Sequence, residues 1–361
     1  MEGLVQEALN NQKEMGNSSD LRIGQAKITI VGCGGAGTNM VTWLHKKGVT
    51  GAKIIAANTD KLHLDQCCSA DVKILLGKEV THGLGCGGFP EKGREAAKES
   101  MHELREHLAH SDMVFCCAGM GGGTGTGGAP VIAKMAKDMG AIVIGTVTMP
   151  FDIERARVDK AEFGLQQLRE ASDTVIVIDN NRLVSIAGNL PIQQAFAVAN
   201  ELVSTMIKGI VEIIAVPSLV NLDYADVKAI MSNGDVSVIG IGESDSEQRV
   251  EEAVKRALTN PLLDVNYNGA SGALIHITGG DDLTLDEVNK VGEIVTESLD
   301  PDANIIWGAR IDPNMKGKVR VMTIITGVNS PYILGKVNHK AVEAEAMMSE
   351  ELGIDMVVPK Y

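Results

Sequence analysis

The sequence predicts an α/β fold: a domain built on a parallel sheet, then a long central helix, then a smaller α+β C-terminal domain. Between residues 26 and 180, six short apolar runs alternate with helix-length amphipathic stretches. A helical segment with one apolar face follows from about Pro191 to Ile214, and the texture changes again beyond Asn221. With 361 residues, the chain is long enough for two domains with substantial cores.

The six apolar runs have the character of buried parallel strands. Each is a nearly continuous row of aliphatic residues, as expected when helices cover both faces of a sheet. The runs are AKITIVG, KIIAAN, VKILLG, DMVFCCAG, AIVIGTVTMP and TVIVIDN. Ligands bind to such sheets at the carboxyl ends of the strands, where the glycine-rich segments of this chain fall.

The second half predicts four further strands and two helices. The strands are expected in DVSVIGIG, ALIHITGG, NIIWGARI and VRVMTIITGV, and the helices near Ser246–Thr259 and Leu283–Leu299. We therefore divide the chain into an N-terminal extension (1–25), the sheet domain (26–190), the core helix and its connection (191–220), the α+β domain (221–330) and a tail (331–361) with a short helical stretch.

Composition excludes several classes of function. A formal net charge of −14 and only 3% aromatic residues argue against general binding to nucleic acid or to anionic membranes. No apolar stretch approaches the roughly 18 residues of a membrane span, and the first residues do not form a secretory signal. The six cysteines have no CxxC spacing and are expected to be reduced, which favours the cytoplasm: Cys33, Cys67, Cys68, Cys86, Cys116 and Cys117.

The run GMGGGTGTGG at Gly119–Gly128 predicts a phosphate-binding loop. It lies between an apolar strand and a helix expected from Ala129, so backbone N–H groups can point into one concavity beside a helix N-terminus. Thr124 and Thr126 add hydroxyl groups, but no lysine follows as in a P-loop. A flexible linker is the alternative, although apolar segments on both sides argue against it.

A second glycine motif follows the first strand. Gly32–Gly37 reads GCGGAG, precedes a helix expected over Asn39–Lys47, and is followed at a suitable distance by Asp60. This pattern alone fits a dinucleotide fold. An NAD-dependent Rossmann oxidoreductase leaves the richer loop at Gly121–Gly127 without a role, whereas one nucleotide with three phosphates uses both loops.

Two further loops are candidates for nucleotide contacts. GLGCGGFP at Gly83–Pro90, with Arg94 on the helix that follows, could close over a terminal phosphate, or it is a plain surface loop. PFDIERAR at Pro150–Arg157 offers Glu154 for ribose hydroxyls and Arg157 for a phosphate or the base, or it is a solvated charged loop.

A pair of carboxylates precedes an amphipathic helix expected at the start of the α+β domain. In NLDYAD, Asp223 suits a helix N-cap, and Asp226 takes the acidic position of a capping box before a helix expected from Val227. The two carboxylates and Asn221 also suit the task of orienting a water for attack on a phosphoanhydride. Both interpretations can hold together.

Together these motifs resemble the FtsZ family, the prokaryotic homologues of tubulin, over about residues 26–328. GGGTGTG is similar to the tubulin-superfamily signature and NLDYADV to the family's synergy loop, while IVGCGGAGTN, AANTD and GLGCGGFP fall in the family's order. Phe89 replaces the usual asparagine of GLGxGxNP, and the segment after Glu154 is one residue shorter than the common pattern. PFDIERAR and the tail resemble a divergent archaeal member, as a second paralogue would be.

The resemblance implies the tubulin/FtsZ fold, with a GTPase domain that binds GTP or GDP and Mg²⁺. Asn58 and Asp60 would line the phosphate and magnesium region, and Glu154 and Arg157 the ribose and nucleotide contacts. Asn180, Phe196 and Asn200 would hold or stack on guanine. The implied phosphate contacts are Gly34, Gly35, Ala36, Gly37, Thr38, Asn39, Gly85, Gly87, Gly121, Gly122, Gly123, Thr124, Gly125, Thr126 and Gly127.

The resemblance also implies an activity shared between copies. Asn221, Asp223 and Asp226 would complete the active site of a neighbouring subunit, so GTP hydrolysis would require head-to-tail assembly into filaments of a cell-division scaffold. The expected partners are the chain itself, a paralogue, and a membrane-anchoring adaptor bound through the terminal IDMVVPKY, with no nucleic acid and no direct membrane insertion. We expect a cytoplasmic protein at the mid-cell division site. A GTP-binding regulator that does not polymerise is the second alternative.

Overall fold

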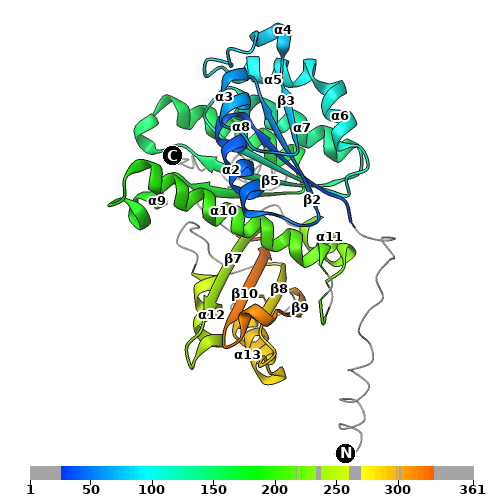
Figure 1. Ribbon diagram of the computed structural model, residues 1–361, viewed down its shortest axis with the longest axis vertical. Helices are drawn as coiled ribbons and strands as arrows, with labels where there is room; N and C mark the ends of the chain where they lie inside the picture. Colours follow the sequence, from blue (N-terminus) through cyan, green and yellow to red (C-terminus); the bar gives the residue numbers. More distant parts are fainter. Residues whose placement is uncertain are drawn as a thin grey trace, which may run out of the picture.

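Six parallel strands form the larger of two sheets, in the order β3-β2-β1-β4-β5-β6 (Figure 1). The computed structural model describes residues 26–216, 218–220, 222–232, 237–259, 270–297, 299–300 and 303–328. Every predicted apolar run contains one strand: β1 (Ile28–Cys33), β2 (Ala52–Asn58), β3 (Val72–Leu75), β4 (Met113–Gly119), β5 (Ile142–Met149) and β6 (Thr174–Asp179). The strand order reverses direction between β1 and β4, which creates a crevice at their carboxyl ends.

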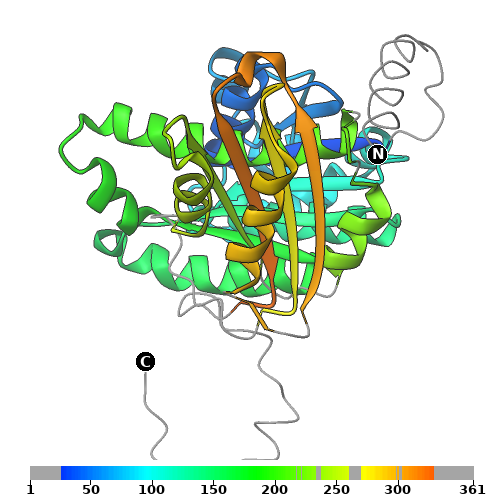
Figure 2. The same ribbon diagram turned by 90° about the horizontal axis from the view of Figure 1, so that it is seen from below.

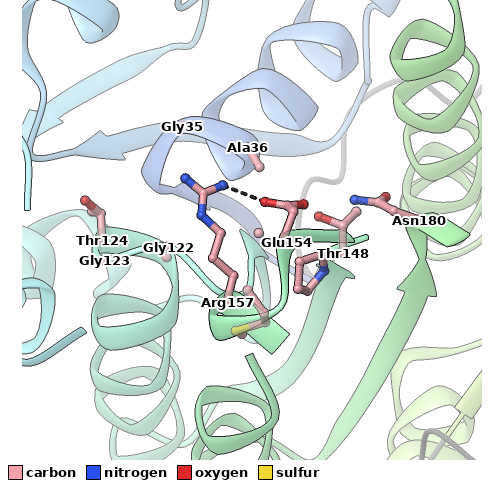
Figure 3. Close-up of a pocket in the computed structure, with 13 residues that line it drawn as sticks. Gly35, Ala36, Gly122, Gly123, Thr124, Thr148, Glu154, Arg157 and Asn180 are labelled. Atoms are coloured by element: carbon pink, nitrogen blue, oxygen red, sulfur yellow. Dashed lines mark hydrogen bonds and ion pairs between the residues drawn. The ribbon is translucent and has the colours of Figure 1, made fainter. Parts of the chain in front are cut away.

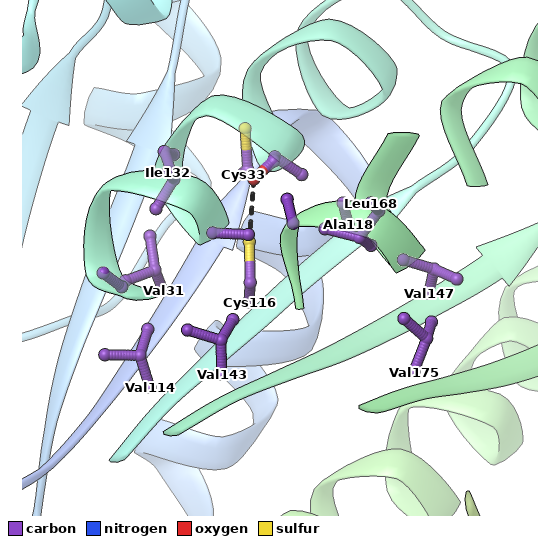
Figure 4. Close-up of a cluster of buried hydrophobic side chains, with 14 of the residues drawn as sticks. Val31, Cys33, Val114, Cys116, Ala118, Ile132, Val143, Val147, Leu168 and Val175 are labelled. Atoms are coloured by element: carbon purple, nitrogen blue, oxygen red, sulfur yellow. Dashed lines mark hydrogen bonds between the residues drawn. The ribbon is translucent and has the colours of Figure 1, made fainter. Parts of the chain in front are cut away.

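Helices cover both faces of this sheet. The side chains of β4 alternate between two cores, with Val114 and Cys116 in one and Phe115 and Cys117 in the other. Figure 4 shows the first core, where Val31, Val143 and Leu168 surround the buried thiols. The helices of the domain are α2 (Gly34–Lys47), α3 (Lys61–Gln66), α4 (Lys78–Thr81), α5 (Pro90–Glu99), α6 (Met101–Leu108), α7 (Thr124–Asp138), α8 (Ala156–Ala171) and α9 (Asn180–Ala187).

The predicted long helix, α10 (Ile192–Ala215), lies between the two sheets (Figure 1). One side packs on α2, and the other faces the second sheet through Gly209, where a Cβ would stand 1.8 Å from Met322 Cε. Buried Val203, Ile207 and Val211 join it to the core that contains Phe115. The helix therefore packs against both domains and contributes to the core between them.

The second sheet has four strands in the order β7-β10-β8-β9, with only β8 and β9 parallel. Its strands are β7 (Ser237–Ser244), β8 (Gly272–Gly279), β9 (Asn304–Ile311) and β10 (Val319–Thr326). The helices α12 (Arg249–Leu258) and α13 (Leu285–Thr296) cover the face that Figure 2 shows from below. The helix α11 (Tyr224–Ser232) shares the opposite core with α10. The predicted α+β architecture is thus confirmed.

Three helices begin earlier than the sequence predicted. The helix expected from Ala129 starts at Thr124, that expected from Asn39 at Gly34, and that expected from Val227 at Tyr224. Glycine is a poor helix former, but tertiary packing overrides this preference. A Cβ on Gly127 would stand 1.9 Å from the Pro90 carbonyl oxygen, so α7 can approach α5 this closely only without a side chain at position 127.

Some predicted segments lie outside the described residues. These are the N-terminal extension (1–25), the tail (331–361) with its terminal IDMVVPKY, and Asn221. Within the described part of the chain, no helix combines the length and apolarity needed to cross a membrane. The six cysteines are free thiols, and burial raises the pKa of Cys116 to about 12. This thiol belongs to the core.

We expect His276 on β8 to make the fold acid-sensitive. Burial, and to a smaller extent the Arg310 guanidinium, lowers the pKa of His276 from 6.5 to about 4. The unfolded chain therefore takes up this proton first as the pH falls, so the stabilisation is full above about 6.5 and is lost towards 4. Urea unfolding should show a loss between pH 7 and pH 5 about 2 kcal/mol larger in the wild type than in His276→Leu. Equal losses would contradict the expectation.

Candidate functional site

A pocket lies at the carboxyl ends of the parallel strands, in the crevice between β1 and β4 (Figure 3). Its volume is about 260 Å³. The lining comes from the ends of β4 and β5, the starts of α2, α7 and α9, and the segment that leads into α8. The lining residues are Gly35, Ala36, Gly119, Met120, Gly122, Gly123, Thr124, Gly125, Thr148, Pro150, Glu154, Arg157 and Asn180.

Two helix N-termini meet at this pocket without caps. A Cβ on Gly34, the first residue of α2, would stand 2.8 Å from the Gly125 nitrogen in the first turn of α7. The N-cap residues Cys33 and Gly123 supply no side-chain hydrogen bond, and neither first turn contains an acidic residue. The free N–H groups and the positive ends of both helix dipoles therefore favour an anion here.

The loop between β4 and α7 is fixed by its own hydrogen bonds. Thr126 Oγ1 accepts a bond of 2.9 Å from the Gly121 N–H, and the Met120 N–H donates to the Thr148 carbonyl at 2.9 Å. Gly121 has φ +91°, and a Cβ there would lie 2.8 Å from the Arg157 carbonyl oxygen. The Thr126 hydroxyl thus shapes the loop rather than facing the cavity.

A buried network joins the third glycine loop to the start of α7. Thr59 and Thr124 share a hydrogen bond of 2.6 Å between their hydroxyl groups, and Cys86 Sγ donates to Thr59 Oγ1 at 3.4 Å. Lys160 on α8 donates to the Gly88 carbonyl at 2.9 Å, with its Nζ 5.6 Å from the centre of the Phe89 ring. Gly85 and Gly87 lie in this loop, beside the pocket rather than in its lining.

Glu154 and Arg157 are the charged side chains among the lining residues. Arg157 Nη1 and Glu154 Oε2 form an ion pair of 2.6 Å across the rim, which Figure 3 shows. The Arg157 side chain is exposed, while Glu154 Oε1 accepts from the Phe151 N–H at 3.1 Å. Because each charge is matched by the other, the backbone supplies the net attraction for an anion.

Aromatic rings lie beyond the end of the pocket where Asn180 begins α9. Phe196 on α10 meets Phe151 in a T-shaped contact, with ring centres 6.0 Å apart and an interplanar angle of 63°. Phe196 is partly exposed, and Asn200 lies one turn further along α10. Asn180 lines the pocket, whereas Phe196 and Asn200 do not.

Other residues expected at the site have structural partners. Gly37 packs on β4, where a Cβ would stand 2.2 Å from the Cys117 carbonyl oxygen, and Thr38 Oγ1 donates to the Gly34 carbonyl at 2.9 Å. Asn39 is exposed on α2. Asn58 Oδ1 accepts from the Thr59 N–H at 2.8 Å. None of these four lines the pocket.

Two more of the expected residues also lie outside the lining. The Asp60 carboxylate caps α3 by accepting from the His63 N–H at 3.0 Å. Arg94, which was expected near the terminal phosphate, donates instead to Gln167 Oε1 of α8 at 2.5 Å and is not part of the pocket lining.

Sequence reasoning missed Thr148, which lines the pocket near the end of β5, whereas Pro150 opens the loop Pro150–Arg157 that was named as a candidate. Thr148 lies at the carboxyl end of a predicted parallel strand, so the rule that ligands bind at these ends could have found it. It also missed Gly93 on α5, where a Cβ would stand 2.3 Å from the Gly123 carbonyl oxygen. That contact joins α5 to the pocket loop, and no sequence motif predicts it.

The carboxylates of Asp223 and Asp226 form a capping box at the start of α11. The Asp226 N–H donates to Asp223 Oδ1 at 2.8 Å, and the Asp223 N–H donates to Asp226 Oδ2 at 3.3 Å. The capping interpretation is thus confirmed. The Tyr224 hydroxyl donates to the Asp112 carbonyl at 2.7 Å, which places this helix at the amino end of β4.

The carboxylates and the pocket therefore lie at opposite ends of one strand. β4 has seven residues and joins Asp112 to the pocket residue Gly119, which corresponds to about 20 Å. Within one chain, neither carboxylate can reach a group bound in the pocket.

A doubly wound sheet with an anion pocket, a central helix and a second sheet domain define a nucleotide-binding protein of the tubulin type. The GTPase-domain model of the Tubulin/FtsZ family matches residues 27–188, and the C-terminal-domain model of the FtsZ family matches residues 235–329. The chain belongs to the FtsZ family.

Several archaeal cell-division proteins are similar to this chain over most of its length. The chain is 56% identical to cell division protein FtsZ 2 of Methanocaldococcus jannaschii over 336 residues, which cover 92% of this chain and 88% of that protein. It is 52% identical to FtsZ 2 of Halobacterium salinarum over 348 residues, with coverages of 95% and 88%. The predicted family and its archaeal character are confirmed.

Solved structures show the same fold. The empty FtsZ dimer of M. jannaschii has a TM-score of 0.78 and 49% identity, and the match covers 89% of this chain and 92% of that one. CetZ2 of Haloferax volcanii, solved as a GTPγS-bound protofilament, has a TM-score of 0.73 at 21% identity, with coverages of 91% and 100%.

We expect Gly122→Ala to weaken nucleotide binding without destabilising the fold. Gly122 lines the pocket, and a Cβ there would meet no atom within 4 Å, so the methyl group occupies space that a phosphate needs. A fluorescent GTP analogue should bind about tenfold more weakly, with the melting temperature nearly unchanged. Gly292→Ala on α13, where a Cβ also meets nothing within 4 Å, is the matched control. Unchanged affinity in Gly122→Ala would show that phosphates bind elsewhere.

Proposed function

We propose that this protein hydrolyses GTP at the contact between two copies stacked head to tail, and that the resulting filaments scaffold the cell-division ring. One observation carries the proposal: the anion pocket and the Asp223–Asp226 pair lie at opposite ends of β4. A second copy stacked along this direction brings its carboxylates to the first copy's pocket. Because the contact joins two different surfaces, it repeats and produces an open filament.

The pocket suits a nucleoside triphosphate. In this proposal the phosphates bind the uncapped starts of α2 and α7, through the backbone of residues 34–39 and 121–127. Glu154 binds ribose hydroxyls and Arg157, released from its ion pair, contacts the nucleotide. Asn180, Phe196 and Asn200 hold guanine at the far end. Membership of the Tubulin/FtsZ GTPase family supports GTP as the nucleotide.

Magnesium is part of the proposal as an ion carried by the nucleotide. Among the described residues, no group of three or more His, Cys, Asp or Glu side chains could hold a metal. This fits Mg²⁺, which binds through substrate phosphates, waters and one or two protein oxygens. Asn58, the last residue of β2, and Asp60, two residues further on, are the residues proposed to hold it. The ion would neutralise charge on the phosphates.

The carboxylates supply the other half of the chemistry. Asp223 is exposed and Asp226 partly exposed, so both can face a neighbouring copy. We assign them the orientation of a water that attacks the γ-phosphorus, while the bond to the β-phosphate oxygen breaks and yields GDP and phosphate. The capping box holds the two side chains at this position before assembly. Asn221 is proposed to assist them.

Exposed apolar side chains support a contact on both ends of the molecule. Leu84 and Ile153 are 85% and 86% exposed on the pocket end, and Leu62 on α3 and Phe89 before α5 are also exposed. Leu219 is 69% exposed next to the carboxylate loop. Stacking head to tail would remove these side chains from water, which favours assembly.

Membership of the FtsZ family argues against the NAD-dependent oxidoreductase alternative. A GTP-binding regulator that does not polymerise is distinguished by the experiments below. A cytoplasmic location at mid-cell, a paralogue and a membrane adaptor that binds the tail complete the proposal. M. jannaschii has both an FtsZ 1 and an FtsZ 2 among the matches, at 52% and 56% identity.

We expect Asp223→Asn to reduce GTP turnover at least about 100-fold while nucleotide affinity and melting temperature stay near wild type. Asparagine caps a helix as well as aspartate does, so this substitution removes the charge and keeps the capping hydrogen bond. Asp286→Asn, at the exposed start of α13, removes the same charge from another helix and should have no effect. Normal turnover in Asp223→Asn would show that the carboxylate serves as a cap only.

A mixture of two inactive variants tests whether the site is shared. Gly122→Val blocks the pocket but keeps the carboxylates, whereas Asp223→Asn keeps the pocket. In an equal mixture with random order, about a quarter of the contacts pair an intact pocket with an intact Asp223. We expect turnover well above the sum of the separate variants. Turnover equal to that sum would mean that each chain carries a self-contained site.

A further inference from the structure

The loop that precedes Asp223 is bound to the free edge of the second sheet. β9 is an edge strand, paired with β8 on one side. On its other side, Val220 forms an isolated antiparallel bridge with Ala309, through N–H···O bonds of 3.1 and 3.2 Å in the two directions. The backbone three residues before Asp223 is therefore fixed to β9.

A glycine on β9 leaves the space that the loop occupies. A Cβ on Gly308 would stand 2.7 Å from Leu222 Cγ, 2.9 Å from Leu222 Cδ1 and 2.9 Å from the Val220 carbonyl oxygen. Leu222 is only 4% exposed and belongs to the core shared by α10 and α11. Real Cβ atoms avoid contacts this short, so a side chain at position 308 would have to displace the loop.

Rotation of Leu222 alone cannot relieve this contact. The Val220 carbonyl is backbone, and it accepts the hydrogen bond from the N–H of Ala309, the residue next to Gly308. Moving it away breaks one of the two bonds that hold the loop. Because carbon atoms in contact stand about 3.5–4 Å apart, the loop would shift by several tenths of an ångström or more.

The same loop is also anchored to the nucleotide domain. Tyr224 donates to the Asp112 carbonyl before β4, while Val220 and Leu222 rest on β9. Asp223 lies between these two anchors, and its capping box with Asp226 transmits the position of the loop to both carboxylates. A displacement of Leu222 away from β9 therefore moves the two carboxylates, because Tyr224 keeps α11 anchored to the nucleotide domain.

We propose that Gly308 is a positioning residue for GTP hydrolysis: its missing side chain lets Val220 and Leu222 sit on β9, which sets where Asp223 and Asp226 face the neighbouring copy. The inference rests on the proposed function, because it assigns the carboxylates to catalysis. Misplacing a reacting group by about 1 Å can reduce a rate about 100-fold. Position 308 therefore controls turnover without touching the nucleotide.

Gly308→Ala tests this inference, with Gly292→Ala on α13 as the matched control. Turnover at saturating GTP should fall about 10- to 100-fold in Gly308→Ala, since a displaced carboxylate is not restored by more substrate. Binding of a fluorescent GTP analogue and sedimentation with a non-hydrolysable GTP analogue should match the wild type, and the melting temperature should fall by only a few degrees, because the displaced loop loses local packing. Gly292→Ala should match it in turnover, analogue binding and sedimentation, because its Cβ meets no atom, and its melting temperature should be no lower, because alanine favours a helix interior over glycine.

Two further measurements separate positioning from a structural role. Mixing Gly308→Ala with the pocket-blocked Gly122→Val should raise turnover above the sum of the two, because the pocket of Gly308→Ala is intact. In the double variant Gly308→Ala with Leu222→Ala, turnover should be no lower than in the worse single variant, since both act through one contact.

Normal turnover in Gly308→Ala would overturn the inference. A loss of nucleotide binding would also overturn it, and so would a melting temperature that falls to the assay temperature, because Gly308 would then support the fold. These outcomes leave the shared site intact if Asp223→Asn is inactive. If Asp223→Asn hydrolyses GTP normally, the proposed function fails first, and the assignment of Gly308 fails with it.

Discussion

The meeting of two helix N-termini at one edge of a sheet is the constraint on which the structure depends. α2 and α7 bring their positive ends together at Gly34 and Gly125: a Cβ on Gly34 would stand 2.8 Å from the Gly125 nitrogen, and one on Gly125 would stand 2.6 Å from the Gly119 carbonyl oxygen. Neither end has a capping side chain or an acidic first turn. Like partial charges held this close repel, and an anion between them removes the repulsion. The glycine loops, the Thr59–Thr124 hydrogen bond and the close packing of α5 all maintain this arrangement.

This way of attracting anions explains how an acidic chain can bind a nucleotide. The net charge is −14, and the rim charges Glu154 and Arg157 neutralise each other, so the attraction is local and comes from the backbone. Carboxylates close to this pocket would repel the phosphates, so carboxylates proposed to act on a phosphate are better placed outside it. In this chain they lie at the other end of β4, about 20 Å away. In the proposed mechanism, binding and hydrolysis are thereby divided between two surfaces, and stacking joins them.

Most of the fold was predictable because buried parallel strands have continuous apolar sequences, and all six apolar runs contain strands. The start of α7 was not predictable, because glycine and the internal Pro130 argue against helix, whereas packing against Pro90 and Arg94 of α5 decides for it. At the site, glycine motifs indicated Gly35 and Gly122, which line the pocket. Thr148 carries no motif, and the space beside Gly308 exists only once β9 and the Leu222 loop meet. Such contacts are tertiary, so the local sequence does not contain them.

The dependence of GTP turnover per molecule on protein concentration, with magnesium present and light scattering recorded in parallel, tests the shared site most directly. If the pocket of one copy needs the carboxylates of the next, turnover per molecule is low in dilute solution. It then rises steeply above a threshold concentration, at which scattering also appears. Turnover per molecule that stays constant across this range, with or without scattering, would show that a single chain hydrolyses GTP by itself and would contradict the account.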